Sequence, residues 1–133
     1  MLWKNAETLG IDLADADAIV ISYGHYDHTG GLPGVLELTR KATVYLHLDA
    51  AKARFSEKSD NTRMIGMSAS ARRKILTLDK AGKVIWTERP TEVLPKLFTT
   101  GRIPRNNDFE DIGGAFYADK ACRTKHGFFN RPS

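Results

Sequence analysis

Apolar residues in the first third of the chain follow two patterns, short continuous runs and helical spacing. Residues 18–22 and 42–47 form apolar, partly β-branched runs, which are typical of strands buried in a sheet. Between them, residues 32–38 show the pattern of a helix, and residues 3–9 predict a short helix that ends at Gly10. This order of strand, helix and strand predicts an α/β fold with at least one crossover connection.

The middle of the chain is more polar and gives weaker patterns. Residues 56–70 contain few large apolar side chains, so we expect a mobile excursion there, serving as a lid or an interface. Two short apolar runs, 74–78 and 83–87, flank a turn at 79–82 and predict a hairpin. Residues 92–101 are expected to lead into one more strand.

The length and composition of the chain predict one globular domain. It has 133 residues, of which 41% are apolar and 27% are charged. Residues 1–117 carry the patterns described above and are assigned to this domain. Residues 118–133 have no clear periodicity and predict an irregular or poorly ordered tail.

Charge, cysteine content and hydropathy exclude several classes of protein. The net charge is +4, but the basic residues are dispersed, which favours a solvated surface over a nucleic-acid interface. No apolar run approaches the roughly 20 residues that cross a bilayer, and the first residues lack the pattern of a signal peptide. The single cysteine, Cys122, allows no internal disulfide. We therefore expect a cytoplasmic protein that makes no membrane contact.

The most informative stretch follows the first predicted strand and runs from Ser22 to Gly31. It places His25, Asp27 and His28 in a glycine-flanked loop directly after a buried run. Imidazole nitrogens and carboxylate oxygens are metal ligands, and a tight loop can turn them towards one ion. The sequence therefore predicts a metal site at these three residues. The alternative is a polar loop in which Asp27 caps the next helix and both histidines bind backbone groups.

This loop resembles the signature of the metallo-β-lactamase superfamily, His-x-His-x-Asp-His. From residue 22 to residue 32 it runs Ser-Tyr-Gly-His-Tyr-Asp-His-Thr-Gly-Gly-Leu. Within the superfamily it is most similar to the dihydropterin ribofuranosyl-aminobenzene phosphate synthase-like branch, and the likeness continues at residues 9–13, 44–47 and 100–105. The resemblance implies a partial αββα sandwich, with a mixed sheet and helices packed on it.

The resemblance also implies a cofactor and a chemistry. Members of the superfamily hold one or two metals, most often zinc, so zinc or another divalent metal is the expected cofactor. By match, His25 would hold the first metal, and Asp27 and His28 the second, with His25 and Asp27 counted as catalytic. Metal-activated water would attack an ester or phosphoester-like substrate. His47 and Arg105 are candidate substrate-binding residues, with an ordinary surface or core position as the alternative for each.

The chain departs from the family pattern in ways that concern the metal site. Tyr23 stands where the leading histidine is expected, and a neutral phenol is a poor zinc ligand. We also expect the chain to be shortened at both ends relative to the family, without the opening strands and the later histidine-bearing segments. A catalytic metal normally has three protein ligands and a water. The expected result is an incomplete site, with metal weakly held or absent, and impaired or lost activity.

The same shortening predicts self-association. A strand at 18–22 without its usual neighbour would present unpaired backbone groups, so we expect a homo-oligomer, with exchange of strands between chains as one form of it. Two functions remain open. The chain is either a metal-dependent hydrolase-type domain that acts on a small-molecule substrate, or a non-catalytic oligomeric module for binding or structure.

Overall fold

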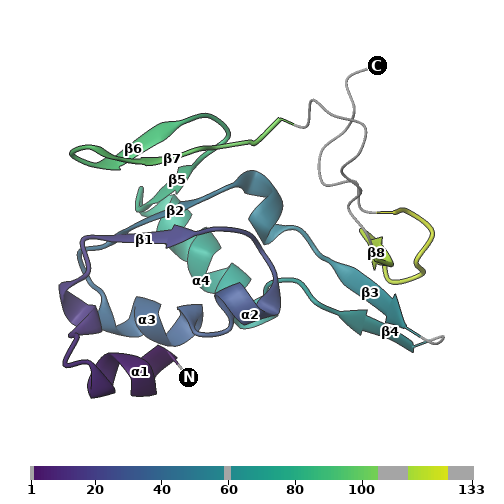
Figure 1. The fold of residues 1–133 in the computed structure, drawn as a ribbon, viewed down its shortest axis with the longest axis horizontal. Helices are drawn as coiled ribbons and strands as arrows, with labels where there is room; N and C mark the ends of the chain where they lie inside the picture. The colour runs from purple at the N-terminus through teal and green to yellow at the C-terminus, as the bar shows by residue number, and fades with distance from the viewer. Residues whose placement is uncertain (1, 59–60, 105–113, 126–133) are drawn as a thin grey trace.

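The computed structural model describes residues 2–58, 61–104 and 114–125. Its central sheet contains three parallel strands in the order β1-β2-β5, namely β1 (Ala18–Ile21), β2 (Thr43–Leu46) and β5 (Val84–Trp86) (Figure 1). The helices of the crossovers are α2 (Tyr26–Thr29) and α3 (Leu32–Leu38), between β1 and β2, and α4 (Ala69–Lys80), before β5. The predicted α/β class is confirmed, together with the crossover between the first two strands.

Two antiparallel sheets accompany the central sheet. The first has the order β4-β3-β8 and consists of β3 (Phe55–Lys58), β4 (Asn61–Met64) and β8 (Phe116–Tyr117). The second is a hairpin of β6 (Thr91–Leu94) and β7 (Leu97–Thr99). The remaining elements are α1 (Leu2–Thr8) and the short 3-10 helices η1 (Leu13–Asp15) and η2 (Leu48–Ala51).

The middle strand, β2, sends alternate side chains to opposite faces of the central sheet. Val44 and Leu46 are buried in one hydrophobic cluster with Ile75 of α4. Tyr45 faces the other side, where its hydroxyl donates a hydrogen bond to the carbonyl oxygen of Val93 at 3.3 Å. Helices therefore cover one face of the sheet, and the β6–β7 hairpin lies over the other (Figure 1).

The predicted hairpin across residues 74–87 is wrong, because its first half belongs to α4. Ala71, Ile75 and Leu78 recur at helical spacing and face the core. Ser68 caps this helix, since its hydroxyl oxygen accepts a hydrogen bond from the backbone N–H of Ala71 at 3.2 Å. Strand β5 pairs in parallel with β2.

Two other segments also contain more regular structure than the sequence predicts. Residues 56–58 and 61–64, expected within a mobile excursion, belong instead to the antiparallel strands β3 and β4. Residues 92–101, expected only to lead into one more strand, contain most of the β6–β7 hairpin, whose turn includes Lys96 with a positive φ of 68°. Exposed hairpins of this kind bury few apolar side chains, which explains why their hydrophobic patterns are weak.

Residues at the two ends of the described chain form short local structures. Helix α1 is followed by Gly10, whose φ of 65° matches the predicted helix stop. In the tail, Asp119 accepts hydrogen bonds from the backbone N–H groups of Arg123 and Thr124, which closes a turn. Residues 126–133 lie outside the described residues. No helix in the described ranges is long and apolar enough to cross a membrane.

Candidate functional site

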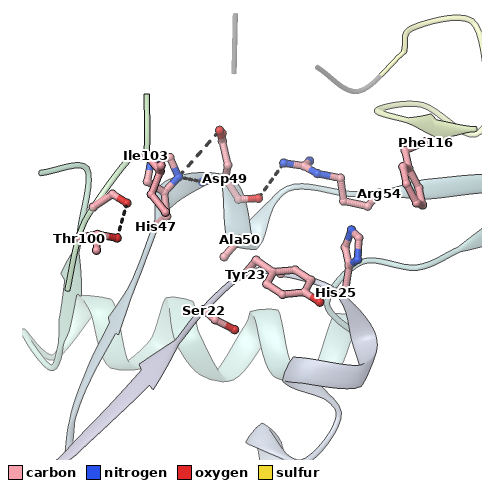
Figure 2. Close-up of a pocket in the computed structure, with 12 residues that line it drawn as sticks. Ser22, Tyr23, His25, His47, Asp49, Ala50, Arg54, Thr100, Ile103 and Phe116 are labelled. Carbon is pink, nitrogen blue, oxygen red and sulfur yellow. Dashed lines mark hydrogen bonds and ion pairs between the residues drawn. The ribbon is translucent and has the colours of Figure 1, made fainter. Parts of the chain in front are cut away.

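A pocket of about 540 Å³ lies at the carboxyl end of the central sheet. One wall is the loop after β1, with Tyr23 and His25, and another is the segment after β2, with His47 (Figure 2). This edge is where open α/β sheets bind their ligands, because the loops after neighbouring parallel strands meet there. The residues that line the pocket are Ser22, Tyr23, Gly24, His25, His47, Asp49, Ala50, Arg54, Thr100, Gly101, Ile103 and Phe116.

Gly24 allows the two loops to approach each other closely. A Cβ atom at this position would lie 2.1 Å from the carbonyl oxygen of Ala50, a distance that Cβ atoms do not adopt. The reason for glycine here is therefore space rather than a left-handed backbone. The loop after β1 can pack directly against η2, and this contact forms the floor between the two walls.

His47 is the N-cap of η2. Its Nδ1 accepts a hydrogen bond from the backbone N–H of Asp49 at 3.1 Å. The Oδ2 atom of Asp49 lies 3.9 Å from the same nitrogen, which is too far for a hydrogen bond. Because Nδ1 is the acceptor, the neutral imidazole carries its proton on Nε2. The cap therefore fixes both the orientation and the tautomer of a histidine in the pocket wall.

Asp49 is the carboxylate of the pocket wall, and it is already paired. Lys52 Nζ lies 2.5 Å from Asp49 Oδ1. Partial burial opposes ionisation of this carboxyl, but the hydrogen bond and charge of Lys52, with smaller effects of His47 and Arg54, bring its pKa below the ordinary value. Asp49 is therefore ionised at neutral pH, with its charge balanced by Lys52.

The His28 ring is held by the residues that follow β1. Ser22 Oγ lies 3.0 Å from His28 Nδ1, within hydrogen-bond distance. The Tyr23 ring packs on the same imidazole, with 3.9 Å between the ring centroids. The other nitrogen, Nε2, is 3.6 Å from Asp27 Oδ2, beyond a normal hydrogen bond. His28 on α2 therefore points back towards the end of β1 and does not line the pocket.

Comparison with known proteins places the chain in a family. Residues 1–110 match the family described as the metallo-beta-lactamase superfamily. The chain belongs to this superfamily. The predicted family is thus confirmed, and the match includes β1, the loop after it and every residue that lines the pocket except Phe116.

Two relatives come from Methanocaldococcus jannaschii. The chain is 27% identical over 100 residues to a 7,8-dihydropterin-6-methyl-4-(beta-D-ribofuranosyl)-aminobenzene-5'-phosphate synthase, which covers 74% of this chain and 33% of that protein. It is 32% identical over 95 residues to an uncharacterized protein, which covers 71% of this chain and 34% of that protein. The chain therefore spans about a third of the length of each relative.

The signature loop of the superfamily does not assemble a metal site in the described residues. Within residues 2–58, 61–104 and 114–125, no group of three or more His, Cys, Asp or Glu side chains is arranged to hold an ion. His25 faces Phe116, with 6.0 Å between the ring centroids, whereas His28 turns towards Ser22. The donor set does not fit a metal ion as it is folded here. The assignment of His25, Asp27 and His28 as ligands stays a prediction.

Burial and local charge determine the protonation of His25. Burial lowers the pKa of its imidazole below the ordinary value; the Asp27 carboxylate opposes this shift, and Arg54 and His28 add to it. The neutral ring is therefore favoured at pH 7.

The structure divides the residues that the sequence singled out. His25 and His47 both line the pocket, whereas Asp27 and His28 lie on α2 and do not. Arg105 lies outside the described residues. Sequence reasoning missed the contributions of Asp49, Arg54, Thr100, Ile103 and Phe116 to the pocket. For Asp49 a signal existed, because it follows β2 just as His25 follows β1.

Proposed function

We propose that this domain binds a small organic molecule in the pocket at the carboxyl ends of β1 and β2. The observation that carries the proposal is the pocket itself, with a volume of about 540 Å³. Its walls combine apolar side chains, including Ile103 and Phe116, with a few polar ones, including His25, His47 and Arg54. This combination is typical of sites for small molecules, in which apolar walls supply affinity and isolated polar groups fix orientation.

The family supports this proposal without specifying the ligand. One relative is named as a synthase of a compound that contains a dihydropterin, an aminobenzene ring and a phosphate. Because the chain spans about a third of that protein, its activity is not transferred to this domain. The name is compatible with a pocket for aromatic molecules in this part of the fold.

A second candidate function is metal-dependent hydrolysis of an ester or phosphoester-like substrate. Membership of the superfamily and the match of His25, Asp27 and His28 to its signature favour it. The observed placement of the side chains favours binding without catalysis by this domain, since the donors do not converge. Elemental analysis of protein purified without chelator separates the two, with His28→Ala as the control. Near-stoichiometric metal that is lost in His28→Ala would favour the hydrolase.

The binding proposal is tested by nuclear magnetic resonance with a library of small aromatic molecules. We expect some of them to shift the backbone signals of Tyr23, His25 and His47. Ile103→Asp places a charge in the apolar wall and should weaken binding about tenfold or more. Leu97→Asp makes the same change on β7, at an exposed position outside the pocket, and should leave binding unchanged. Shifts that avoid the pocket, or equal effects of the two variants, would contradict the proposal.

A further inference from the structure

Arg54 is a buried cation in the wall of the pocket. Only 6% of its surface is exposed, which is unusual for an arginine. Its guanidinium donates hydrogen bonds to the carbonyl oxygens of Ala53 at 2.8 Å and Asp49 at 2.9 Å. Two of its five N–H groups are used in these contacts, and the other three make no hydrogen bond to the residues that the structure describes.

The backbone of Arg54 is fixed between other segments. Its carbonyl oxygen accepts hydrogen bonds from the N–H groups of Ile65 at 2.8 Å and Gly66 at 3.2 Å. A Cβ atom on Gly66 would lie 2.9 Å from the nitrogen of Arg54, so this close approach requires glycine. Ile65 in turn accepts a hydrogen bond from the N–H of Tyr26 at 2.9 Å. Arg54 is therefore held against the loop after β1 by consecutive backbone contacts.

The charge of Arg54 is not balanced by an ion pair within the described residues. The carboxylate nearest to it in the pocket wall, Asp49, pairs with Lys52. The contacts that Arg54 does make are to neutral carbonyl oxygens. Burying a cation without a direct ion pair is costly, and an anion that enters the pocket would offset that cost. Figure 2 shows the Arg54 side chain extending along the pocket towards Asp49, above Tyr23 and His25.

We infer that Arg54 anchors the anionic oxygen group, a carboxylate or a phosphate, of the ligand that this pocket binds. The inference rests on the proposed function and adds the chemical class of the ligand. The planar guanidinium can donate parallel hydrogen bonds to two oxygens of such a group. The apolar part of the ligand then lies against the wall that contains Tyr23, Ile103 and Phe116. A small molecule with both an acidic group and an apolar ring fits these features.

Titration with three probes that share one ring tests this inference. Phenyl phosphate and benzoate carry the two candidate anions, and benzyl alcohol is the neutral comparison. Dissociation constants from calorimetry should be at least about tenfold lower for one of the anions than for the alcohol. Comparison of the two anions identifies the preferred group. Arg54→Gln should remove this preference, whereas Arg72→Gln, at an exposed position on α4, should retain it.

The unmodified protein provides a test that does not depend on the folding of Arg54→Gln. The Nε–H signal of Arg54 should shift when phenyl phosphate or benzoate is added, and binding should weaken as sodium chloride rises. If the Nε–H signal does not shift and binding does not depend on salt, Arg54 does not anchor the ligand. If benzyl alcohol binds in the pocket as tightly as both anions, the proposed function stands and the anchor is wrong. If none of a wider set of aromatic probes binds in the pocket, both are wrong.

Discussion

The ring of Tyr23 packs on the ring of His28, with 3.9 Å between their centroids. Tyr23 occupies the position of the leading histidine in the superfamily signature, and His28 occupies the position of the last. The two rings are inclined by 41° to each other, so a phenol ring lies against the imidazole where the superfamily signature has a metal-binding histidine. In this arrangement, no group of three or more His, Cys, Asp or Glu side chains among the described residues is placed to hold an ion.

Replacing Tyr23 with histidine should increase the affinity for a divalent metal. The imidazole restores a ligand at the leading position and removes the phenol ring from His28. Because even outer-shell partners change metal affinity 10- to 100-fold, we expect a gain of about tenfold or more in zinc affinity, measured by competition with a chromogenic chelator. Tyr23→Phe keeps a packed ring without a ligand atom and serves as the control. Equal affinities of the two variants would contradict the prediction.

Gly24→Ala should destabilise the domain. The new methyl group would meet the carbonyl oxygen of Ala50 at 2.1 Å, so either the loop after β1 or η2 must move. Overpacking of this kind costs about 1–3 kcal/mol, which urea denaturation would measure as a loss in the free energy of unfolding. Gly31→Ala is the control, because its nearest neighbour is the flexible side chain of Leu2 at 3.3 Å. If Gly31→Ala loses as much stability as Gly24→Ala, the close contact with Ala50 does not explain the effect.

Protonation of Asp49 should make the domain less stable in acid. Its pKa is lowered in the folded protein, where the ion pair with Lys52 outweighs partial burial, from an ordinary value of 3.8. Its stabilising contribution is therefore present above about pH 4 and disappears as the pH falls through the lower, folded pKa. We expect less than about 1 kcal/mol, because Asp49 remains partly exposed to solvent.

The measurement for Asp49 is the free energy of unfolding between about pH 2 and pH 6. In Asp49→Asn, the free energy of unfolding should fall less between about pH 6 and pH 2 than in the parent protein; this decrease is the acid limb of the curve. Glu88→Gln removes an exposed carboxylate elsewhere and should leave that limb nearly unchanged. Identical acid limbs for the parent and Asp49→Asn would show that the Lys52 pair contributes nothing to stability.

Ile75→Ala should be among the most destabilising substitutions in the chain. Ile75 is fully buried in the cluster between α4 and the central sheet. Truncating a buried isoleucine costs about 2–5 kcal/mol. Leu76→Ala is a matched control, because the neighbouring Leu76 is 47% exposed and should cost less than about 1 kcal/mol. Comparable losses in the two variants would contradict the observed orientation of α4.

The contrast between β1 and α4 shows how far the sequence predicts this fold. Strand β1 and helix α3 carry continuous local patterns, so they could be predicted within one or two residues. In α4, Ile75 and Leu78 alone do not separate a strand from a helix, because the decisive third position is the small residue Ala71. The parallel pairing of β5 with β2 depends on residues about 40 positions apart, and no local pattern predicts it.

The sequence predicts only those parts of the candidate site that follow from the order of strands and loops along the chain. His25 and His47 each follow a buried strand, so their meeting at one edge of a parallel sheet could be expected. Arg54 could not be found in this way. Its burial depends on the close approach of Gly66, which is 12 positions away and belongs to an unpredicted hairpin region. Phe116 likewise reaches the pocket only through the pairing of β8 with β3.

The exposed edge of β1 supports the prediction that the chain self-associates. Strand β1 pairs with β2 on one side, and among the described residues no strand pairs with its other side. Val20, in the middle of this strand, is 48% exposed. An unpaired edge with apolar side chains favours pairing with another chain, because both the backbone groups and the apolar surface gain partners.

Light scattering at micromolar concentrations should therefore give a mass above the 14.8 kDa of one chain. Val20→Lys should shift the distribution towards the monomer, since a charge on an edge strand opposes pairing. Leu97→Lys adds the same charge to β7, where Leu97 is 52% exposed, and should leave the mass unchanged. A stable monomer of the parent protein would overturn the prediction. Equal dissociation by both variants would point to net charge, rather than the β1 edge, as the determinant of assembly.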